Sequence, residues 1–434
     1  MNNIHLSGIA ADLAKLENEN KEISLGIIGA GEMGTDLVTQ VMLMKGIKIA
    51  AIAARRPHTA FDALKIAYGN DDLGLEVNTP SDMSNAIENG KIAITADADL
   101  MVSTGQIDIV IDATGKPGVA ADYILKAMQH GKHIVMMNVE ADVTIGRYLK
   151  AQAKKLGVIY SLGAGDEPSS CLELIEFVSA LGLTIVSAGK GKNNPLKHDA
   201  VPSDYIEEAK RRNMNPRVLV EFVDGSKTAV EMAAIANATG LVPDVPGMHG
   251  PNASREDLAK VLIPKADGGI LNNIGVVDYT IGKGVAPGIF VVAKATHPRI
   301  IERMDDLHIG NGPYYGFFRP YHLTSLEVPL TCARIMLHKK ADMVPLDEPV
   351  AEVCAIAKRD IKIGEKIDAI GETCYRSFTM KAQEAKQKSC LPVGLLEGGK
   401  AITSIKKGEL ITSKNATPDK TTKLFEMRLK QDNM

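Results

Sequence analysis

The sequence contains no tryptophan, and aromatic residues make up only 4% of its 434 positions. Its five cysteines are odd in number and include no C-x-x-C pair, which excludes an obvious disulfide framework or zinc motif. Reduced thiols in a cytoplasmic protein are the simplest interpretation. No apolar run reaches the roughly 18 residues of a membrane-spanning helix, and the first residues lack the pattern of a signal peptide. We therefore expect a cytoplasmic protein without a membrane partner.

The sequence also has no marked excess of positive or negative charge. The 50 lysines and arginines nearly balance the 53 aspartates and glutamates, and the net charge of −3 gives no electrostatic basis for binding nucleic acid. Hydrophobic residues at 45% and charged residues at 24% are typical of a globular protein. A chain of this length exceeds one small core, so we expect two or three domains.

The clearest motif lies near the start of the chain, in residues 24–56, which read as strand, glycine-rich turn, helix and strand. Gly29, Gly31 and Gly34 form G-x-G-x-x-G directly after an apolar run, the context that the dinucleotide fingerprint requires. The helix that follows offers free N–H groups to a pyrophosphate. The alternative is a glycine-rich turn that binds nothing.

The second strand of this motif ends without an acid. An Asp or Glu there would bind the ribose 2′-hydroxyl of NAD, but residues 53–56 read Ala-Ala-Arg-Arg. The guanidinium groups of Arg55 and Arg56 suit a 2′-phosphate instead. The sequence therefore predicts NADPH as the cofactor.

Two further apolar strands, at 108–112 and 133–137, are followed by polar turns at 113–117 and 138–140. Ligands of open α/β sheets bind at such carboxyl ends. We expect helices at 118–130 and 150–157 and a strand at 158–162. The predicted cofactor-binding residues are Gly29, Gly31, Glu32, Met33, Gly34, Arg55, Arg56, Ala113, Thr114, Gly115, Asn138, Glu140 and Gly165.

Beyond Gly163 the regular alternation of strand and helix ends. Short strands are expected at 183–187 and 217–223, and a longer helix near Ser226, which indicates an α+β middle domain. A helical pattern at 323–337 is expected to pack back on the first domain. The predicted divisions are 1–162, 163–322, 323–345 and 346–434.

The last division consists of short predicted β-strands between turns. Two of its pieces resemble each other, one with Arg359-Asp360 before Gly364-Glu365 and one with Lys406-Lys407 before Gly408-Glu409. The tail at 417–434 is charged, and we expect it to be mobile or weakly helical.

Two carboxylates, Asp166 and Glu167, lie in a loop of small residues at 163–170. Such a pair suits a divalent metal ion or proton transfer. The alternative is an acidic cap and a proline that begin a helix through Phe177, and both interpretations can hold.

The loop at 189–198 concentrates cations and amides, among them Lys190, Lys192 and Asn193. These groups suit a phosphate or carboxylate of a small substrate. The alternative is a solvated basic loop, but the buried strand before it favours a site.

Lys227 and Glu231 are spaced i, i+4 on the predicted helix near Ser226, and periodicity alone favours a surface ion pair over a pair aimed into a cleft. His249 lies beside a glycine. Tyr315, Arg319 and His322 belong to an aromatic and polar cluster that starts at His308, for which a pocket or subunit interface is the best explanation.

The motifs GIIGAGEMG, IDATGKPG, MMNVEADV, GAGDEPSS, GKGKNNP and AIAKRDIKIGEKID…LPVGLLEGG span nearly the whole chain. With them the chain resembles homoserine-dehydrogenase-like oxidoreductases fused to a SAF (β-clip) domain. Within these it is most similar to the 1-deoxy-D-xylulose 5-phosphate reductoisomerase-like (DRL) enzymes. The resemblance implies a homodimer of the α/β class with an N-terminal doubly wound Rossmann sheet, an α+β catalytic middle domain and a C-terminal all-β SAF domain.

One departure from homoserine dehydrogenases is informative. They carry an Asp and, four residues later, a Lys in the helix where this chain has Lys227 and Glu231, with the charges reversed. This argues against homoserine as the substrate and moves both residues toward the site.

The resemblance implies that the chain rearranges a phosphorylated ketose and reduces the resulting aldehyde with NADPH, with Mg²⁺ or Mn²⁺ bound. The candidate catalytic residues are Lys190, Lys227, Glu231, Asp166 and Glu167. The candidate metal ligands are Asp166, Glu167 and Glu231. The candidate substrate-binding residues are Lys190, Lys192, Asn193, His249, Tyr315, Arg319 and His322.

Two other functions stay open at this point. One is an NAD(P)-dependent dehydrogenase of another small substrate, such as a sugar acid, a sugar phosphate or a homoserine-like compound. The other is a SAF-type protein that binds sugars or assists assembly without catalysis, which fits the intact fingerprint poorly.

Overall fold

The computed structural model describes residues 6–193, 195–212 and 214–434, which divide into two compact units. The first unit comprises the chain up to Asp166 together with Leu323–Val344 and Met427–Met434. The second unit comprises Glu167–His322 and Pro345–Glu426. Each unit is described by itself below, and no helix of the described residues is both long and apolar enough to cross a bilayer.

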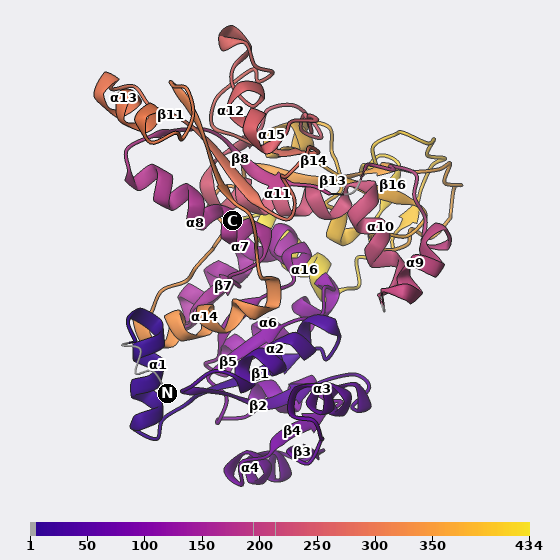
Figure 1. The fold of residues 1–434 in the computed structure, drawn as a ribbon. Helices are drawn as coiled ribbons and strands as arrows, with labels where there is room; N and C mark the ends of the chain where they lie inside the picture. Colours follow the sequence, from indigo (N-terminus) through magenta and orange to yellow (C-terminus); the bar gives the residue numbers. More distant parts are fainter. Residues whose placement is uncertain (1–5, 194, 213) are drawn as a thin grey trace. The chain divides into compact units, whose positions relative to one another are not determined.

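The first unit contains a seven-stranded parallel sheet in the order β3-β4-β2-β1-β5-β6-β7 (Figure 1). Its strands are β1 (Ile23–Ile28), β2 (Ile47–Ala53), β3 (Gly74–Glu76), β4 (Ile92–Thr95), β5 (Ile109–Asp112), β6 (His133–Met136) and β7 (Tyr160–Leu162). Strands β2, β3 and β4 lie on one side of β1, and strands β5, β6 and β7 lie on the other side. The carboxyl ends of β1 and β5 therefore flank the switch point at which such sheets bind dinucleotides, and the predicted doubly wound sheet is confirmed.

The helices of this unit cover an apolar core built on the sheet. They are α1 (Gly8–Asn18), α2 (Glu32–Met42), α3 (His58–Tyr68), α4 (Pro80–Glu88), α5 (Ala98–Ser103), α6 (Pro117–Gln129) and α7 (Val139–Leu156). The segment that returns at Leu323 forms η4 (Thr324–Leu326), α14 (Val328–Ala333) and a π-helical turn η5 (Arg334–His338). Val328, Cys332 and Ile335 from this segment belong to the same core as Ile27 and Ile109.

Two predictions for this unit concern helices. The helix expected at 150–157 already begins at Val139, because the Asn138 side chain accepts a hydrogen bond from the Ala141 N–H at 3.1 Å and caps it. The tail, expected to be mobile or weakly helical, forms helix α16 (Lys423–Asp432). Gln431 is buried, and its amide bonds the Tyr148 N–H and the Thr144 carbonyl.

The second unit contains a five-stranded mixed sheet in the order β12-β11-β8-β10-β9. Its strands are β8 (Thr184–Gly191), β9 (Val242–Pro243), β10 (Val276–Thr280), β11 (Ile289–Lys294) and β12 (Tyr314–Arg319). Its helices before the C-terminal segment are α8 (Glu167–Ala180), η1 (Pro202–Tyr205), α9 (Ile206–Arg211), α10 (Pro216–Asp224), α11 (Ser226–Thr239), η2 (Arg255–Asp257), α12 (Leu258–Val261), η3 (Lys265–Asp267) and α13 (Pro298–Asp306). Helices α8 and α11 contact each other, and they also contact strands of this sheet.

The strand expected at 217–223 is wrong, because these residues belong to helix α10. The Asn215 side chain accepts from the Arg217 N–H at 3.0 Å, and Pro216 occupies the first turn. Leu219, Val220 and Val223 are buried at helical spacing. Residues 217–223 alone resemble an apolar strand, because the helix-capping Asn215 and the proline of the first turn lie before them.

The C-terminal segment of the second unit contains two small antiparallel sheets. They pair β13 (Ala351–Ala357) with β14 (Tyr375–Lys381), and β15 (Lys400–Ala401) with β16 (Ala416–Thr417). The segment is not purely β, since it includes α15 (Ala382–Gln387) and η6 (Val393–Leu395). A SAF topology stays a prediction.

The two similar pieces of this segment do fold alike. In one turn the Glu365 carboxylate accepts from the Lys362 N–H at 2.8 Å, and in the other the Glu409 carboxylate accepts from the Lys406 N–H at 2.8 Å. A backbone bridge between Ile361 and Ile405 joins the two pieces.

Asn237 joins helix α11 to strand β13. Its side-chain oxygen accepts from the N–H groups of Val350 and Ala351, at 2.9 and 3.0 Å, and its amide nitrogen donates to the Ala351 carbonyl at 3.1 Å. Asn237 is buried, so water cannot replace these bonds without opening the packing.

Asn237→Ala should therefore destabilise the second unit by about 1–3 kcal/mol, the cost of leaving buried backbone groups unpaired. The thermal unfolding midpoint of the purified protein measures this change. Lys260→Ala, at an exposed ion pair with Asp257, is the control and should leave the midpoint unchanged. Equal midpoints for the wild type and Asn237→Ala would contradict the assigned role.

Candidate active site

The glycine fingerprint forms the turn between β1 and α2 in the first unit. Gly29 has a φ of +105°, which favours glycine, and a Cβ on Gly34 would lie 2.2 Å from the Gly29 carbonyl oxygen. A Cβ on Gly31 would meet no atom within 4 Å, so open space lies in front of this residue. Glu32 and Met33 follow in the exposed first turn of α2.

No side chain caps the N-terminus of α2, which begins at Glu32 after Gly31. Its first N–H groups therefore face the open space beside Gly31, as a pyrophosphate site requires. Arg55 and Arg56 follow the end of β2 and are exposed. Within the described residues neither arginine forms an ion pair. These observations fit a dinucleotide with a 2′-phosphate.

The turn after β5 is held by a buried carboxylate. Asp112 is fully buried, and its Oδ1 accepts from both the N–H and the hydroxyl of Thr114, at 2.9 and 2.6 Å. Its Oδ2 accepts from the Asn138 amide at 3.0 Å, which ties the end of β5 to the start of α7. Burial raises the pKa of Asp112. This network fixes the loop that carries Ala113 and Gly115.

Four of the residues predicted to bind cofactor are buried, namely Gly34, Asn138, Glu140 and Gly165. Glu140 is buried in the first turn of α7. A Cβ on Gly165 would lie 2.4 Å from the Thr324 carbonyl oxygen, and the Gly165 carbonyl accepts from the Thr324 N–H at 2.7 Å. Gly165 thus packs closely against the returning segment.

In the second unit, Lys190 on β8 lies between two glutamates. Its Nζ is 2.6 Å from Oε1 of Glu167, at the start of α8, and makes a second, short contact with Oε2 of Glu231 on α11. Lys227, one turn before Glu231, has its Nζ 3.9 Å from the other oxygen of Glu231. We call Lys190, Glu167, Glu231 and Lys227 the Lys190 cluster.

Within the Lys190 cluster, Lys190 and Glu231 are buried, Glu231 being only 1% exposed, and Glu167 and Lys227 are half-buried. The surface ion pair that periodicity favoured for Lys227 and Glu231 is therefore wrong. Helix α11 is buried nearly all round, because α8, β10 and the C-terminal strands β13 and β14 all contact it. An i, i+4 spacing shows that two residues share a face of a helix, but it does not show whether that face is exposed or covered.

Burial and the neighbouring Glu167 raise the pKa of Glu231 to about 7. Burial alone would lower the pKa of Lys190, but Glu167 and Glu231 more than offset this and raise it. Lys190 therefore stays charged at neutral pH, while Glu231 can take up and release a proton there. Such a group is suited to general acid–base chemistry.

Lys192 is also buried, and its Nζ donates to the Phe222 carbonyl. Burial, together with the charge of Lys190, lowers its pKa to about 8. Asn193, the next residue, is exposed. Asn194 of the same predicted loop lies outside the described residues.

The remaining substrate-binding candidates have different surroundings. Tyr315 is fully buried, and its hydroxyl bonds Asp305 at 2.7 Å and the Ile301 carbonyl at 3.1 Å. The prediction that Tyr315 binds substrate is wrong in this structure, because its hydroxyl holds α13 against β12. Arg319 pairs with Glu173 at 2.9 Å and stacks on Tyr321.

His322 and His249 make separate contacts. The Nε2 atom of His322 lies 3.5 Å from Oε1 of Glu167, which places His322 beside the Lys190 cluster. The Nε2 atom of His249 lies 2.8 Å from Oδ2 of Asp244, and the backbone N–H of His249 donates to the Asp278 carboxylate. The sequence analysis did not single out Asp244 or Asp278, and neither belongs to a spaced motif.

A divalent metal ion fits poorly between Glu167 and Glu231, two of the ligands that the resemblance implies. Carboxylates are suitable ligands for Mg²⁺ or Mn²⁺, but the Lys190 ammonium group lies between the facing oxygens of Glu167 and Glu231. Lys190 and Lys227 also bring two positive charges to this position. Asp166, the third candidate ligand, belongs to the first unit.

The pH dependence of stability tests the state of Glu231. Between its unfolded pKa, near 4.5, and about 7, folded Glu231 keeps a proton that the unfolded chain releases. The contribution of this residue to stability therefore falls as the pH rises through that window. Glu231→Gln does not titrate, so its melting temperature relative to wild type should be higher at about pH 8 than at about pH 5.

Glu256→Gln, at an exposed position of the same unit, is the matched control. Its difference from wild type should change little between the two pH values. A difference for Glu231→Gln that is the same at both would contradict the assigned protonation of Glu231.

Comparison with known proteins finds two matching segments, which meet close to the boundary between the two units at Asp166. Residues 29–162 match the family described as homoserine dehydrogenase, NAD binding domain. Residues 165–328 match the family described as oxidoreductase DRL, catalytic domain, and this match contains the whole Lys190 cluster. No SAF domain appears among these matches.

Individual relatives cover less of the chain. The homoserine dehydrogenase of Methylobacillus glycogenes is 33% identical over 118 residues, which are 27% of this chain and 25% of that protein. That of Pseudomonas aeruginosa is 27% identical over 153 residues, 33% of this chain and 29% of that protein. The chain thus spans between a quarter and a third of the curated relatives' length.

Among solved structures, apo scyllo-inositol dehydrogenase from Lactobacillus casei has a TM-score of 0.42 and 15% identity. The similarity covers 74% of this chain and 90% of that one. The family matches over residues 29–162 and 165–328 are more specific. The chain is therefore similar to the homoserine dehydrogenase NAD-binding domain over residues 29–162 and to the DRL oxidoreductase catalytic domain over residues 165–328.

Proposed function

We propose that this protein is an NADPH-dependent reductoisomerase that converts 1-deoxy-D-xylulose 5-phosphate to 2-C-methyl-D-erythritol 4-phosphate. The observation that carries the proposal is the Lys190 cluster, a set of buried and half-buried charged groups inside the segment that matches the DRL catalytic domain. The protein would take part in the synthesis of isoprenoid precursors. We further propose that it acts as a homodimer, as the resemblance implies.

The reaction has two steps with different demands. The first moves a carbon–carbon bond of the ketose, so that one hydroxyl loses a proton, the ketone oxygen gains one, and a branched aldehyde forms. In the second, the aldehyde carbon receives a hydride and its oxygen receives a proton, which gives the alcohol. Bound NADPH supplies the hydride and leaves as NADP⁺.

The residues of the Lys190 cluster suit the proton transfers. In the first step Glu231, with its pKa raised to about 7, would accept the hydroxyl proton and return it to the ketone oxygen; in the second it would donate a proton taken up from water to the aldehyde oxygen. Lys190 would hold the carboxylate of Glu231 in place. Lys227 would stabilise negative charge on the reacting oxygen. No step is assigned to a divalent ion, because the Lys190 ammonium group lies between the carboxylates of Glu167 and Glu231.

Phosphate binding is assigned to Lys192 and Asn193. Within the described residues the Lys192 ammonium group has one acceptor, the Phe222 carbonyl, which leaves two N–H groups for a phosphate oxygen. Asn193 is exposed and adds an amide donor. A bound phosphate would raise the pKa of Lys192 from about 8.

The direct test is incubation with deoxyxylulose phosphate and NADPH while the absorbance of the reduced cofactor is followed. The wild type should consume NADPH, with or without a chelator such as EDTA. Glu231→Gln should lower kcat by about 10²-fold or more, because it removes the proton carrier. Glu256→Gln should match the wild type.

Failure of the wild type to oxidise NADPH with this substrate would overturn the proposed reaction. Oxidation with a sugar acid or another small substrate instead would favour the dehydrogenase alternative. Failure to bind any nicotinamide cofactor by calorimetry would favour the non-catalytic one. Activity that is lost in EDTA and restored by Mn²⁺ would contradict the proposal that no step uses a divalent ion.

The cofactor preference follows from Arg55 and Arg56. Each charge-assisted hydrogen bond to a 2′-phosphate is worth about 1.5–3 kcal/mol, so removal of both arginines should raise KM for NADPH at least about tenfold. NADH lacks this phosphate, and its KM should stay nearly constant in Arg55→Ala/Arg56→Ala. Arg299→Ala, an exposed arginine on α13, is the control. A wild type that uses NADH better than NADPH would contradict this assignment.

A further inference from the structure

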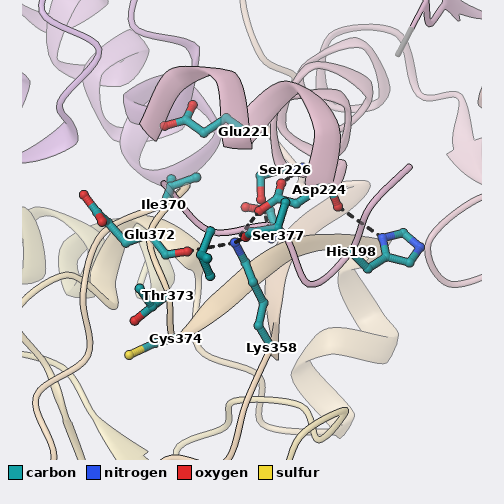
Figure 2. Close-up of polar contacts among 12 residues, drawn as sticks. His198, Glu221, Asp224, Ser226, Lys358, Ile370, Glu372, Thr373, Cys374 and Ser377 are labelled. Carbon is teal, nitrogen blue, oxygen red and sulfur yellow. Dashed lines mark hydrogen bonds and ion pairs between the residues drawn. The ribbon is translucent and has the colours of Figure 1, made fainter. Parts of the chain in front are cut away.

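A second buried ion pair lies in the second unit, apart from the Lys190 cluster. Lys358 follows strand β13, and Asp224 ends helix α10. The side chains are 1% and 0% exposed, and Nζ of Lys358 is 2.8 Å from Oδ2 of Asp224. Figure 2 shows the lysine pointing from the C-terminal segment toward the turn between α10 and α11.

The Lys358 ammonium group also binds backbone oxygens. Its Nζ donates to the carbonyls of Ala200 and Glu372, each at 2.8 Å, while the Asp224 carboxylate lies at ion-pair distance. These three partners come from separate stretches of the second unit. Lys358 therefore links the three stretches, and its hydrogen bonds fix backbone positions.

The other oxygen of Asp224 holds the start of helix α11. Oδ1 accepts from the Ser226 N–H at 2.8 Å, across Gly225, whose φ of +92° reverses the chain between the two helices. The carbonyl of Asp224 lies 3.2 Å from Nδ1 of His198. Asp224 thus joins the end of one helix to the first turn of the next.

Strand β14 holds the same turn from a second side. The Ser377 N–H donates to the Ser226 hydroxyl at 2.8 Å, and the Thr379 hydroxyl donates to the Ala229 carbonyl at 2.6 Å. Lys227 lies between these two anchored residues, and Glu231 follows one turn later. A displacement of the first turn of α11 would move both of these side chains.

We propose that Lys358 is a positioning residue that acts through Asp224 to fix the first turn of α11, and with it Lys227 and Glu231. This rests on the proposed function, because only that function gives these two residues a chemical role. The C-terminal segment would then be a structural part of the catalytic unit. Replacement of Lys358 should disturb α11 even though Lys358 touches none of the proposed reacting groups.

Three variants separate positioning from stability. Lys358→Met leaves the Asp224 carboxylate buried without its partner, which also lowers stability. Lys358→Met/Asp224→Asn removes both charges but keeps an oxygen that can accept from the Ser226 N–H. Lys407→Met is the matched control, because Lys407 also joins the C-terminal segment to the middle of the chain, at Asp199, through an exposed ion pair.

The double variant should regain the melting temperature lost by Lys358→Met, while its kcat stays lowered by about 10-fold to 10²-fold, since small displacements of reacting groups cost this much. KM for NADPH should be unchanged in both. Lys407→Met should match the wild type. Recovery of kcat together with stability in the double variant would overturn the positioning role.

The pH profile of kcat provides a second readout. The charged groups that face Glu231 are Glu167 from α8, Lys190 and Lys192 from β8 and its end, and Lys227 from α11 itself. A loosened α11 admits water, so the limb due to Glu231 should shift to lower pH in the double variant. A purely structural role would lower kcat without moving the limb.

Hydrogen exchange separates this inference from the proposed function. Amides at 226–231 should exchange faster in Lys358→Met/Asp224→Asn than in the wild type, and amides of β1 and β5 should not change. If the wild type has no reductoisomerase activity but exchange at 226–231 still rises, the anchor holds and only the proposed function fails. Unchanged exchange in an active enzyme would overturn the anchor alone.

Discussion

The ion pairs of Lys190 with Glu167 and Glu231 constrain the rest of the second unit. Two carboxylates buried side by side repel each other, and loss of the ammonium group between them would cost about 3–5 kcal/mol. The pairs join strand β8 to helices α8 and α11, so these three elements have to meet at one place. The same pairing keeps Lys190 charged and leaves Glu231 able to titrate near neutral pH.

The two units contribute different features to the proposed function. The first supplies a dinucleotide turn whose glycines leave open space before the N-terminus of α2, followed on the next strand by two exposed arginines. The second supplies buried charges that suit proton transfer. Its C-terminal segment packs along α11, where Ser377 and Thr379 of the segment bond the helix and Asn237 of the helix bonds the segment. These contacts explain why a helix that carries two charged residues is buried nearly all round.

Most of the first unit could be predicted from the sequence, because its signals are local. Gly29, Gly31 and Gly34 follow an apolar strand, and a parallel sheet gives continuous apolar runs. The second unit was harder, since its decisive contacts join distant residues. Helical spacing placed Lys227 and Glu231 on one face but could not show that α11 is covered by α8, β10, β13 and β14. Lys358 stands in a basic pair after a predicted strand, and this pattern does not indicate that its side chain is buried in an ion pair with Asp224.

The metal ion inferred from the resemblance is the clearest case in which residue type and structure disagree. Anomalous diffraction at the manganese edge, from crystals grown with Mn²⁺, tests the account most directly. The account predicts no manganese peak between Glu167 and Glu231, and density for the Lys190 ammonium group in that place. A manganese ion bound by these two carboxylates, with Lys190 turned away, would contradict it.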